Sequence, residues 1–235
     1  MTSHCLFHVV CAKATSPHKR KSSAEPDFDI SSAPAPLMVH PQGGLPIRSP
    51  FLVYDRLHAK SWVMLYSFAD SACELGLSVS RDGGVSWQFY GTAILPIDAV
   101  SEKHANLRVD APFLIWWGDR TKDPSRNMDG GLHGWHLFVT LWEEHQQQAS
   151  RIAHFFSRQI DPLAVDFEFR GVVAEAGPRA SDPCVVRLHR GLFRLLFTDR
   201  RRTKGETSAL TSPDLVHWKP SRDATRYSPF HLFPG

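Results

Sequence analysis

The stretch Ala111-Pro112-Phe113-Leu114-Ile115-Trp116 decides the fold, because the sequence uses the same opening three times. A proline followed by apolar residues also begins the two runs Ser49-Pro50-Phe51-Leu52-Val53-Tyr54 and Asp182-Pro183-Cys184-Val185-Val186. The second opening proline lies 62 residues after the first, and the third lies 71 residues after the second. Such self-similarity predicts a repeated structural unit.

Three more short runs follow each opening in the same order. They lie at residues 62–67, 75–80 and 87–91 in the first unit, at 135–140, 151–156 and 167–172 in the second, and at 192–197, 207–211 and 217–218 in the third. The runs are rich in β-branched and aromatic residues and end at turn residues, which predicts strands. No stretch sustains the i, i+3, i+4, i+7 spacing of an amphipathic helix.

Four-stranded antiparallel units repeated at this length are typical of β-propeller blades. We therefore expect an all-β protein with a disordered leader over residues 1–32 and one propeller domain over residues 33–235. The blades are predicted at about residues 47–95, 108–175 and 180–222, with a partial blade at 226–235. A stack of β-sandwiches is the alternative architecture.

The composition excludes several classes of protein. Hydrophobic residues make up 42% and charged residues 22% of the 235, which is ordinary for a globular domain. The net charge of +3 does not indicate nucleic-acid binding, and no apolar run reaches the roughly 18 residues of a membrane span. The basic runs at residues 18–21 and 200–202 are expected to be a solvated tail and a solvated turn. No convincing signal peptide is present, so the localisation stays open between cytoplasmic and secreted.

Metal and cofactor sites are not predicted. The four cysteines lie far apart, and neither a His-x-Glu nor a Cys-x-x-Cys spacing occurs. Asp123 and Asp129 belong to a polar, glycine-rich insertion at residues 118–134, and we interpret them as solvated turn residues.

Two turns between predicted third and fourth strands have related sequences. They are Ser80-Arg81-Asp82-Gly83-Gly84-Val85-Ser86-Trp87 and Ser212-Pro213-Asp214-Leu215-Val216-His217-Trp218. An aspartate in such a hairpin can accept hydrogen bonds from backbone amides, and glycine can adopt a positive φ. We expect both turns to be structural.

These motifs resemble those of known propellers. The first turn is similar to the Asp-box pattern Ser-x-Asp-x-Gly-x-Thr/Ser-Trp of sialidase-like propellers. The second resembles the Ser-x-Asp-Leu-x-x-Trp blade ending of five-bladed glycoside hydrolases, which also begin inner strands with Ala-Pro or Asp-Pro, as at residues 110–112 and 181–183 here. Over about residues 36–230 the chain resembles the arabinanase, β-xylosidase, invertase and levanase types (families 43 and 32), with about three of the five blades recognisable.

The resemblance implies a carbohydrate-active hydrolase that cleaves O-glycosidic bonds of furanosides, xylosides or fructosides in an oligosaccharide or polysaccharide. Such cleavage needs one ionised carboxylate and one carboxylic acid on either side of the bond. Asp110 and Asp182 begin inner strands at what the sequence suggests are matching blade positions, so they are the candidate catalytic carboxylates. Glu175, in the segment before Asp182, is the candidate general acid.

Other residues near the predicted inner strands are candidates for substrate binding: Arg48, Ser49, His40 and Trp117. Ser49 stands where an aspartate would complete the family's set, and no glutamate begins an inner strand. A non-catalytic carbohydrate-binding or scaffold propeller, or a sialidase-like Asp-box propeller, therefore remains an alternative. An incomplete ring would expose strand edges, which predicts self-association. No nucleic-acid or membrane partner is expected.

Overall fold

A computed structural model describes residues 47–55, 61–68, 74–96, 107–118, 133–143, 146–159, 163, 166–188, 191–201 and 206–221. The predicted leader, the partial blade at 226–235, His40, Asp123 and Asp129 lie outside these residues. The proposed domain limits therefore stay a prediction. Within the described residues, no helix is long and apolar enough to cross a membrane.

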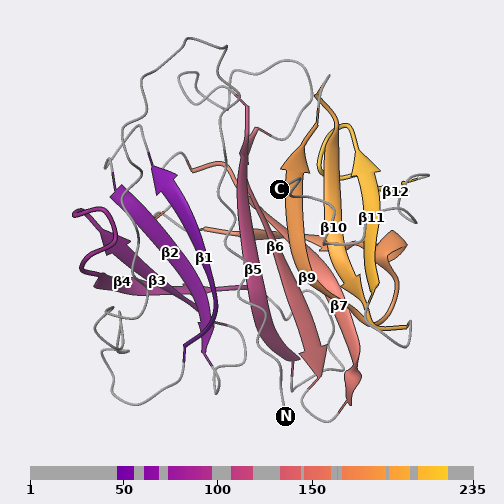
Figure 1. The fold of residues 1–235 in the computed structure, drawn as a ribbon, viewed down its shortest axis with the longest axis horizontal. Helices are drawn as coiled ribbons and strands as arrows, with labels where there is room; N and C mark the ends of the chain where they lie inside the picture. The colour runs from indigo at the N-terminus through magenta and orange to yellow at the C-terminus, as the bar shows by residue number, and fades with distance from the viewer. Residues whose placement is uncertain are drawn as a thin grey trace, which may run out of the picture. The chain divides into compact units, whose positions relative to one another are not determined.

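The described chain forms three four-stranded antiparallel sheets, which Figure 1 shows in colours from indigo to yellow. The first sheet has the order β1 (Ile47–Asp55), β2 (Ser61–Phe68), β3 (Glu74–Ser80) and β4 (Gln88–Ile94). The second has the order β5 (Leu107–Trp117), β6 (Gly134–Glu143), β7 (Gln146–Ser157) and β8 (Glu168–Val172). The third has the order β9 (Ala180–Arg187), β10 (Phe193–Asp199), β11 (Glu206–Ser212) and β12 (Lys219–Pro220).

This topology confirms the all-β propeller prediction, because in every sheet each strand pairs with the strand that follows it in the sequence. We call β1, β5 and β9 the inner strands. The β-sandwich alternative is wrong, because each sheet consists of four strands that are consecutive in the sequence and pair in that order. A short 3₁₀ turn, η4 (Ala174–Ala176), lies between β8 and β9.

The fourth strands begin later than the sequence predicts. Trp87 and Trp218 were expected inside these strands, but β4 starts at Gln88 and β12 at Lys219. Each indole instead closes the preceding turn: Trp87 Nε1 donates to the Gly84 carbonyl and Trp218 Nε1 to the Leu215 carbonyl, both at 3.1 Å.

The middle sheet has both faces covered. Leu137 and Val139 of β6 join a core cluster with Val63 and Leu65 of β2. Phe138, between them in the sequence, belongs to a second cluster with residues of the third sheet, such as Val185 and Leu195. Because alternate residues of a strand point to opposite faces, β6 is buried almost throughout, and the three sheets pack one on the next.

A third cluster, on the other face of the first sheet, contains Met64, Tyr66 and Phe68. Tyr66 is fully buried, and its hydroxyl lies 3.2 Å from the Ser78 hydroxyl. Burial raises the pKa of Tyr66, against a smaller lowering by that hydrogen bond. Gly76 leaves room for the ring, because a Cβ there would lie 2.1 Å from Tyr66 Cε2.

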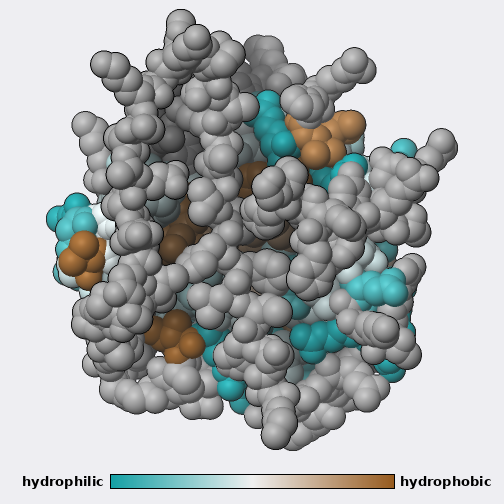
Figure 2. All heavy atoms as spheres, in the orientation of Figure 1, coloured by the Kyte–Doolittle hydropathy of each residue, from teal (hydrophilic) through white to brown (hydrophobic). Residues whose placement is uncertain are grey.

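Apolar side chains also reach the surface. The large hydrophobic residues that are exposed are Leu52, Tyr54, Val85, Tyr90, Leu192 and Val216. On the face drawn in Figure 2, the described apolar side chains, in brown, lie in separate small patches. Self-association through open blade edges therefore stays a prediction.

Candidate active site

The three inner strands share one backbone distortion near their starts. Ser49, Ala111 and Asp182 have positive φ angles of 47°, 47° and 57°, and each directly precedes a proline. The pairing register between inner and second strand shifts at the same places. A non-glycine residue in this conformation costs about 1 kcal/mol or more, so the surrounding structure must hold it there.

The distortion shows that the two candidate aspartates are not equivalent. Asp182 is itself a positive-φ residue, but Asp110 lies one residue before the positive-φ position of its strand. The equivalents of Asp110 in the other two inner strands are Arg48 and Ser181. The expectation that both aspartates occupy matching blade positions is therefore wrong by one residue. The offset follows from the prolines, because Asp110 lies two residues before Pro112 and Asp182 directly precedes Pro183.

Asp110 is held at the junction of the first and second sheets. Its Oδ1 accepts hydrogen bonds from the Ser67 hydroxyl and from the Ala111 backbone amide, both at 2.7 Å. The Ser67 oxygen also lies 3.2 Å from the carbonyl of Arg48, but a hydroxyl has one proton, and the shorter contact is the one to Asp110. Ser67 on β2 thus reaches across to β5.

Asp182 is held at the junction of the second and third sheets. Its backbone amide donates to the Thr140 hydroxyl at 2.9 Å, and its Oδ2 accepts a hydrogen bond from Ser181 at 2.7 Å. Arg200 Nη2 lies 3.9 Å from the same Oδ2.

The two junctions have the same arrangement of a second-strand hydroxyl and the next inner strand. Ser67 lies opposite Arg48 in the pairing of β1 with β2, and Thr140 lies opposite Asp110 in the pairing of β5 with β6. Each hydroxyl on a second strand therefore contacts the inner strand of the next sheet. Sequence reasoning missed both hydroxyls. The signal that could have found them is a serine or threonine at the same register position in two blades.

Arg200 and Arg201 form an exposed turn, as the sequence predicts, but Arg201 also has a buried partner. Arg201 binds the buried carboxylate of Asp199 with two side-chain hydrogen bonds, of 2.8 and 2.6 Å, and its backbone amide adds a third at 3.0 Å. These hydrogen bonds raise the pKa of Arg201. The Arg200 amide donates to the Arg179 carbonyl at 3.0 Å. The third member of the run, Arg202, lies outside the described residues.

The Asp199–Arg201 pair supports the segment that carries Glu175. Gly177 has a φ of 72°, and a Cβ at this position would lie 2.7 Å from Arg201 Nη1. The guanidinium therefore packs directly on the backbone two residues after Glu175. The Glu175 side chain is exposed on η4, while the neighbouring Ala176 is buried and anchors the turn.

Trp117 does not lie near Asp110. It lies at the far end of β5, seven residues from Asp110, which at roughly 3.3 Å per residue is about 23 Å along the strand. There its ring packs edge-on against Phe193, with a centroid separation of 4.8 Å, and lies under the Arg187 guanidinium at 5.0 Å. Arg48, in contrast, is exposed, and its carbonyl lies 3.2 Å from the Ser67 hydroxyl that donates to Asp110. Among the described residues, no group of three or more His, Cys, Asp or Glu side chains could hold a metal ion.

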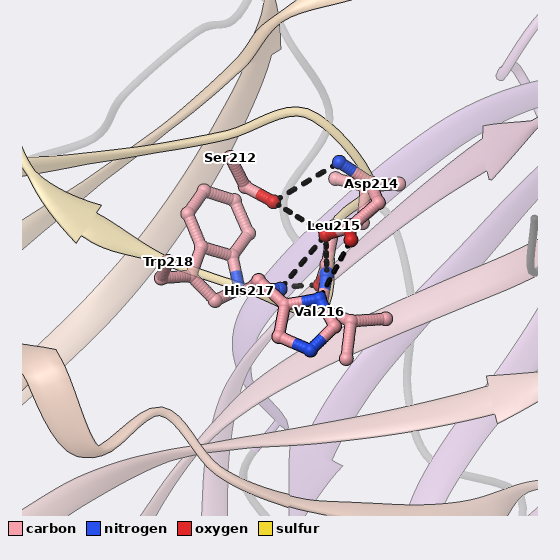
Figure 3. A network of polar contacts seen from close by, with 6 residues as sticks. All are labelled: Ser212, Asp214, Leu215, Val216, His217 and Trp218. Atoms are coloured by element: carbon pink, nitrogen blue, oxygen red, sulfur yellow. Dashed lines mark hydrogen bonds and ion pairs between the residues drawn. The ribbon is translucent and has the colours of Figure 1, made fainter.

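The two aspartate turns are closed by their own hydrogen bonds, as Figure 3 shows for Asp214. Asp214 Oδ1 accepts from the amides of Val216 and His217, at 2.9 and 2.8 Å, and Oδ2 lies 2.7 Å from His217 Nδ1. Burial raises the pKa of Asp214, but these hydrogen bonds together lower it well below its usual value. Asp82 makes the same kind of contacts with Ser86, which lower its pKa.

The second sheet has a related serine contact at the end of β7, which sequence reasoning missed. The Gln159 amide donates to the Ser157 hydroxyl at 3.2 Å, as the Asp214 amide does to Ser212 at 3.2 Å. Gln159 therefore stands relative to Ser157 as Asp214 stands relative to Ser212.

No model of a known protein family matches the sequence, and no curated protein matches it. Solved structures do match. A family 117 glycoside hydrolase from Zobellia galactanivorans has a TM-score of 0.54 at 13% identity, over 76% of this chain and 56% of that one. The Penicillium chrysogenum α-L-arabinanase has a TM-score of 0.50 at 13% identity, over 74% of this chain and 48% of that one.

A third match is the exo-β-1,3-galactanase from Clostridium thermocellum, with a TM-score of 0.50 at 11% identity, over 74% of this chain. The chain has the fold of the propeller glycoside hydrolases. It spans about half the length or less of these solved structures, between 35% and 56%.

Proposed function

We propose that the chain contributes a carbohydrate site that hydrolyses O-glycosidic bonds with Asp110 and Asp182. The observation that carries this proposal is the way both carboxylates are held. Asp110 accepts its two hydrogen bonds at Oδ1, while Asp182 accepts from Ser181 and faces Arg200 at Oδ2. Among the described residues, Asp110 Oδ2 and Asp182 Oδ1 have no hydrogen-bond partner. Each side chain is thus fixed through one oxygen and offers the other to a ligand.

The chemistry follows from this arrangement. An ionised carboxylate either attacks the anomeric carbon or activates a water molecule, and a second group protonates the leaving oxygen. We assign the first role to Asp110, whose orientation is fixed by Ser67 and its own strand. Asp182, one blade further, orients the substrate. Glu175 is our candidate for the acid, because it is the exposed carboxyl on the segment that leads into β9.

The substrate class follows the resemblance to arabinanases, xylosidases and fructosidases, so we propose furanosides, xylosides or fructosides. The test is release of the chromophore from a panel of aryl glycosides by the full chain. Asp110→Asn should lower kcat by about 10²-fold or more, because the amide cannot act as base or nucleophile. Asp166→Asn is the matched control, since Asp166 is exposed and remote from both inner-strand starts in the sequence. Equal turnover by Asp110→Asn and the wild type would contradict the proposal.

A non-catalytic carbohydrate-binding propeller is the second candidate. The observation that favours it is the first inner strand, which has Arg48 and Ser49 at the two positions where the other strands place their aspartates. Oligosaccharide binding without any turnover across the panel would decide for this candidate.

A further inference from the structure

One buried threonine is linked to both candidate aspartates. Thr140 on β6 pairs with Asp110 in the β5–β6 ladder, and neighbouring strands of a sheet lie about 4.8 Å apart. The Thr140 hydroxyl accepts a hydrogen bond of 2.9 Å from the backbone amide of Asp182, which belongs to β9 of the next sheet. A short path from one aspartate to the other therefore runs through Thr140.

This hydrogen bond acts on the distorted part of β9. Asp182 has a φ of 57°, which persists only where the surrounding structure holds it. The next residue, Pro183, has no backbone N–H, so the Asp182 amide is the backbone donor of this dipeptide. The contacts of Asp182 with Ser181 and Arg200 stay within its own blade. The contact with Thr140, in contrast, fixes Asp182 relative to the second sheet.

The position of Thr140 recurs in the other two described sheets. The second-strand residue that pairs two positions before the repeated proline is Ser67 in the first sheet, Thr140 in the second and Thr198 in the third. Ser67 and Thr140 each contact the inner strand of the next sheet. Within the described part of the chain, no inner strand follows the third sheet. Thr198 therefore has the same register position without this contact to a further described blade.

We propose that Thr140 is a positioning residue that holds Asp182 in place relative to Asp110. This inference rests on the carbohydrate site proposed above and adds a residue to it. Thr140 is 4% exposed, so it acts through Asp182 and not by touching a sugar. Groups that act on one substrate must be held in a precise geometry, and a displacement of about 1 Å can lower a rate by about 10²-fold.

A competing explanation is that Thr140 only stabilises the packing of β6 on β9. The two explanations differ in what they predict when the Asp182 carboxylate is removed. A purely structural role predicts that loss of the Thr140 hydroxyl lowers activity by the same factor with or without that carboxylate. A positioning role predicts that the loss disappears once the carboxylate is gone, because two residues that act through one group have non-additive effects.

The test measures kcat/KM of the full chain with aryl glycosides for Thr140→Val, Thr140→Ser and Thr198→Val, in the wild-type and Asp182→Asn backgrounds. Valine has nearly the shape of threonine but cannot accept the hydrogen bond, so Thr140→Val should lower kcat/KM by about tenfold or more in the wild-type background. It should cause no further loss with Asp182→Asn. Thr140→Ser keeps the hydroxyl and should retain the wild-type value, as should the matched control Thr198→Val.

Thermal unfolding checks that each variant folds. If Thr140→Val does not fold, Thr140→Cys takes its place, because a cysteine sulfur is only a weak acceptor. An equal loss in the Asp182→Asn background, wild-type activity of Thr140→Val, or an equal loss in Thr198→Val would overturn the inference.

Calorimetric binding of neutral oligosaccharides separates this inference from the proposed hydrolysis. If the wild type binds a sugar without turnover, hydrolysis is refuted, and the same comparison of variants is made on Kd. Binding that is about tenfold weaker in Thr140→Val, with no further weakening in the Asp182→Asn background, would then support the positioning role. Hydrolysis by a Thr140→Val variant as fast as by the wild type would refute the positioning role alone. A wild-type chain that neither binds nor hydrolyses any sugar would overturn both.

Discussion

The Tyr66 ring leaves no room for a side chain at Gly76 on the neighbouring strand β3. A Cβ at Gly76 would lie 2.1 Å from Cε2 and 2.3 Å from Cζ of this fully buried ring. Overpacking of this kind typically costs about 1–3 kcal/mol, so we expect Gly76→Ala to lower the free energy of unfolding by roughly 2 kcal/mol in a urea titration. Gly91→Ala is the control, because a Cβ there meets nothing within 4 Å. Similar stability of the two variants would contradict this account of the Tyr66 cluster.

The residues of the candidate site were only partly predictable. Asp110 and Asp182 were found because each stands beside a repeated proline opening. Their offset by one residue could also have been read from the sequence, because Asp110 lies two residues before Pro112 and Asp182 directly precedes Pro183; the positive φ angles agree with it. The ion pair of Arg201 was not predicted, because a basic run carries no sign of its partner. Asp199 precedes it by only two residues, but its burial comes from the packing of β10 and not from local sequence.

Two facing strands of the second sheet carry a buried histidine pair. His136 Nδ1 on β6 lies 2.9 Å from His154 Nε2 on β7, and the Phe138 ring stacks on His154 at 4.6 Å. Burial first, and then the charges of His136 and Arg170, hold the pKa of His154 well below its usual value, against a smaller opposing effect of Asp214. His154 is therefore neutral in the folded protein, and at this contact one ring nitrogen donates to the other.

This pair predicts loss of stability in mild acid. The unfolded chain binds a proton at His154 near the ordinary pKa of about 6.5, while the folded chain does not, so the stabilisation is present above that pH and declines as the pH falls toward the folded pKa. Urea titrations between pH 7.5 and 5.5 should show it. In His154→Gln the slope of unfolding free energy against pH should be smaller, by up to about 1.4 kcal/mol per pH unit. Parallel pH profiles of variant and wild type would contradict the prediction.

At the same scale, strand existence was easier to predict than strand ends. Among the described residues, the predicted runs overlap β1 to β11, whereas the run at residues 217–218 ends just before β12. The fourth strands were placed one or two residues early, because Trp87 and Trp218 look like strand residues in sequence but use their indole N–H groups to close turns. Hydrogen bonds of this kind depend on the turn conformation, which the residue pattern alone does not specify.

For the described part of the molecule, the repeat of proline openings was enough to predict three consecutive blades. The repeat predicts blades because each four-stranded sheet buries apolar side chains against its neighbours, as β6 does on both faces. The contacts between blades were harder to predict from the sequence. Ser67 and Thr140 are ordinary strand residues in sequence, and only the register of two sheets shows that each reaches the inner strand of the next.

The central claim is that Asp110 and Asp182, on neighbouring inner strands, act in one reaction. It is tested most directly by kcat/KM of the full chain with the best aryl glycoside of the panel, for Asp110→Asn, Asp182→Asn and the double variant. Groups that act as a unit have strongly non-additive effects. We predict a loss of about 10²-fold or more in each single variant and little further loss in the double variant, with Asp166→Asn unaffected. Losses that multiply in the double variant, or single variants with wild-type turnover, would contradict the claim.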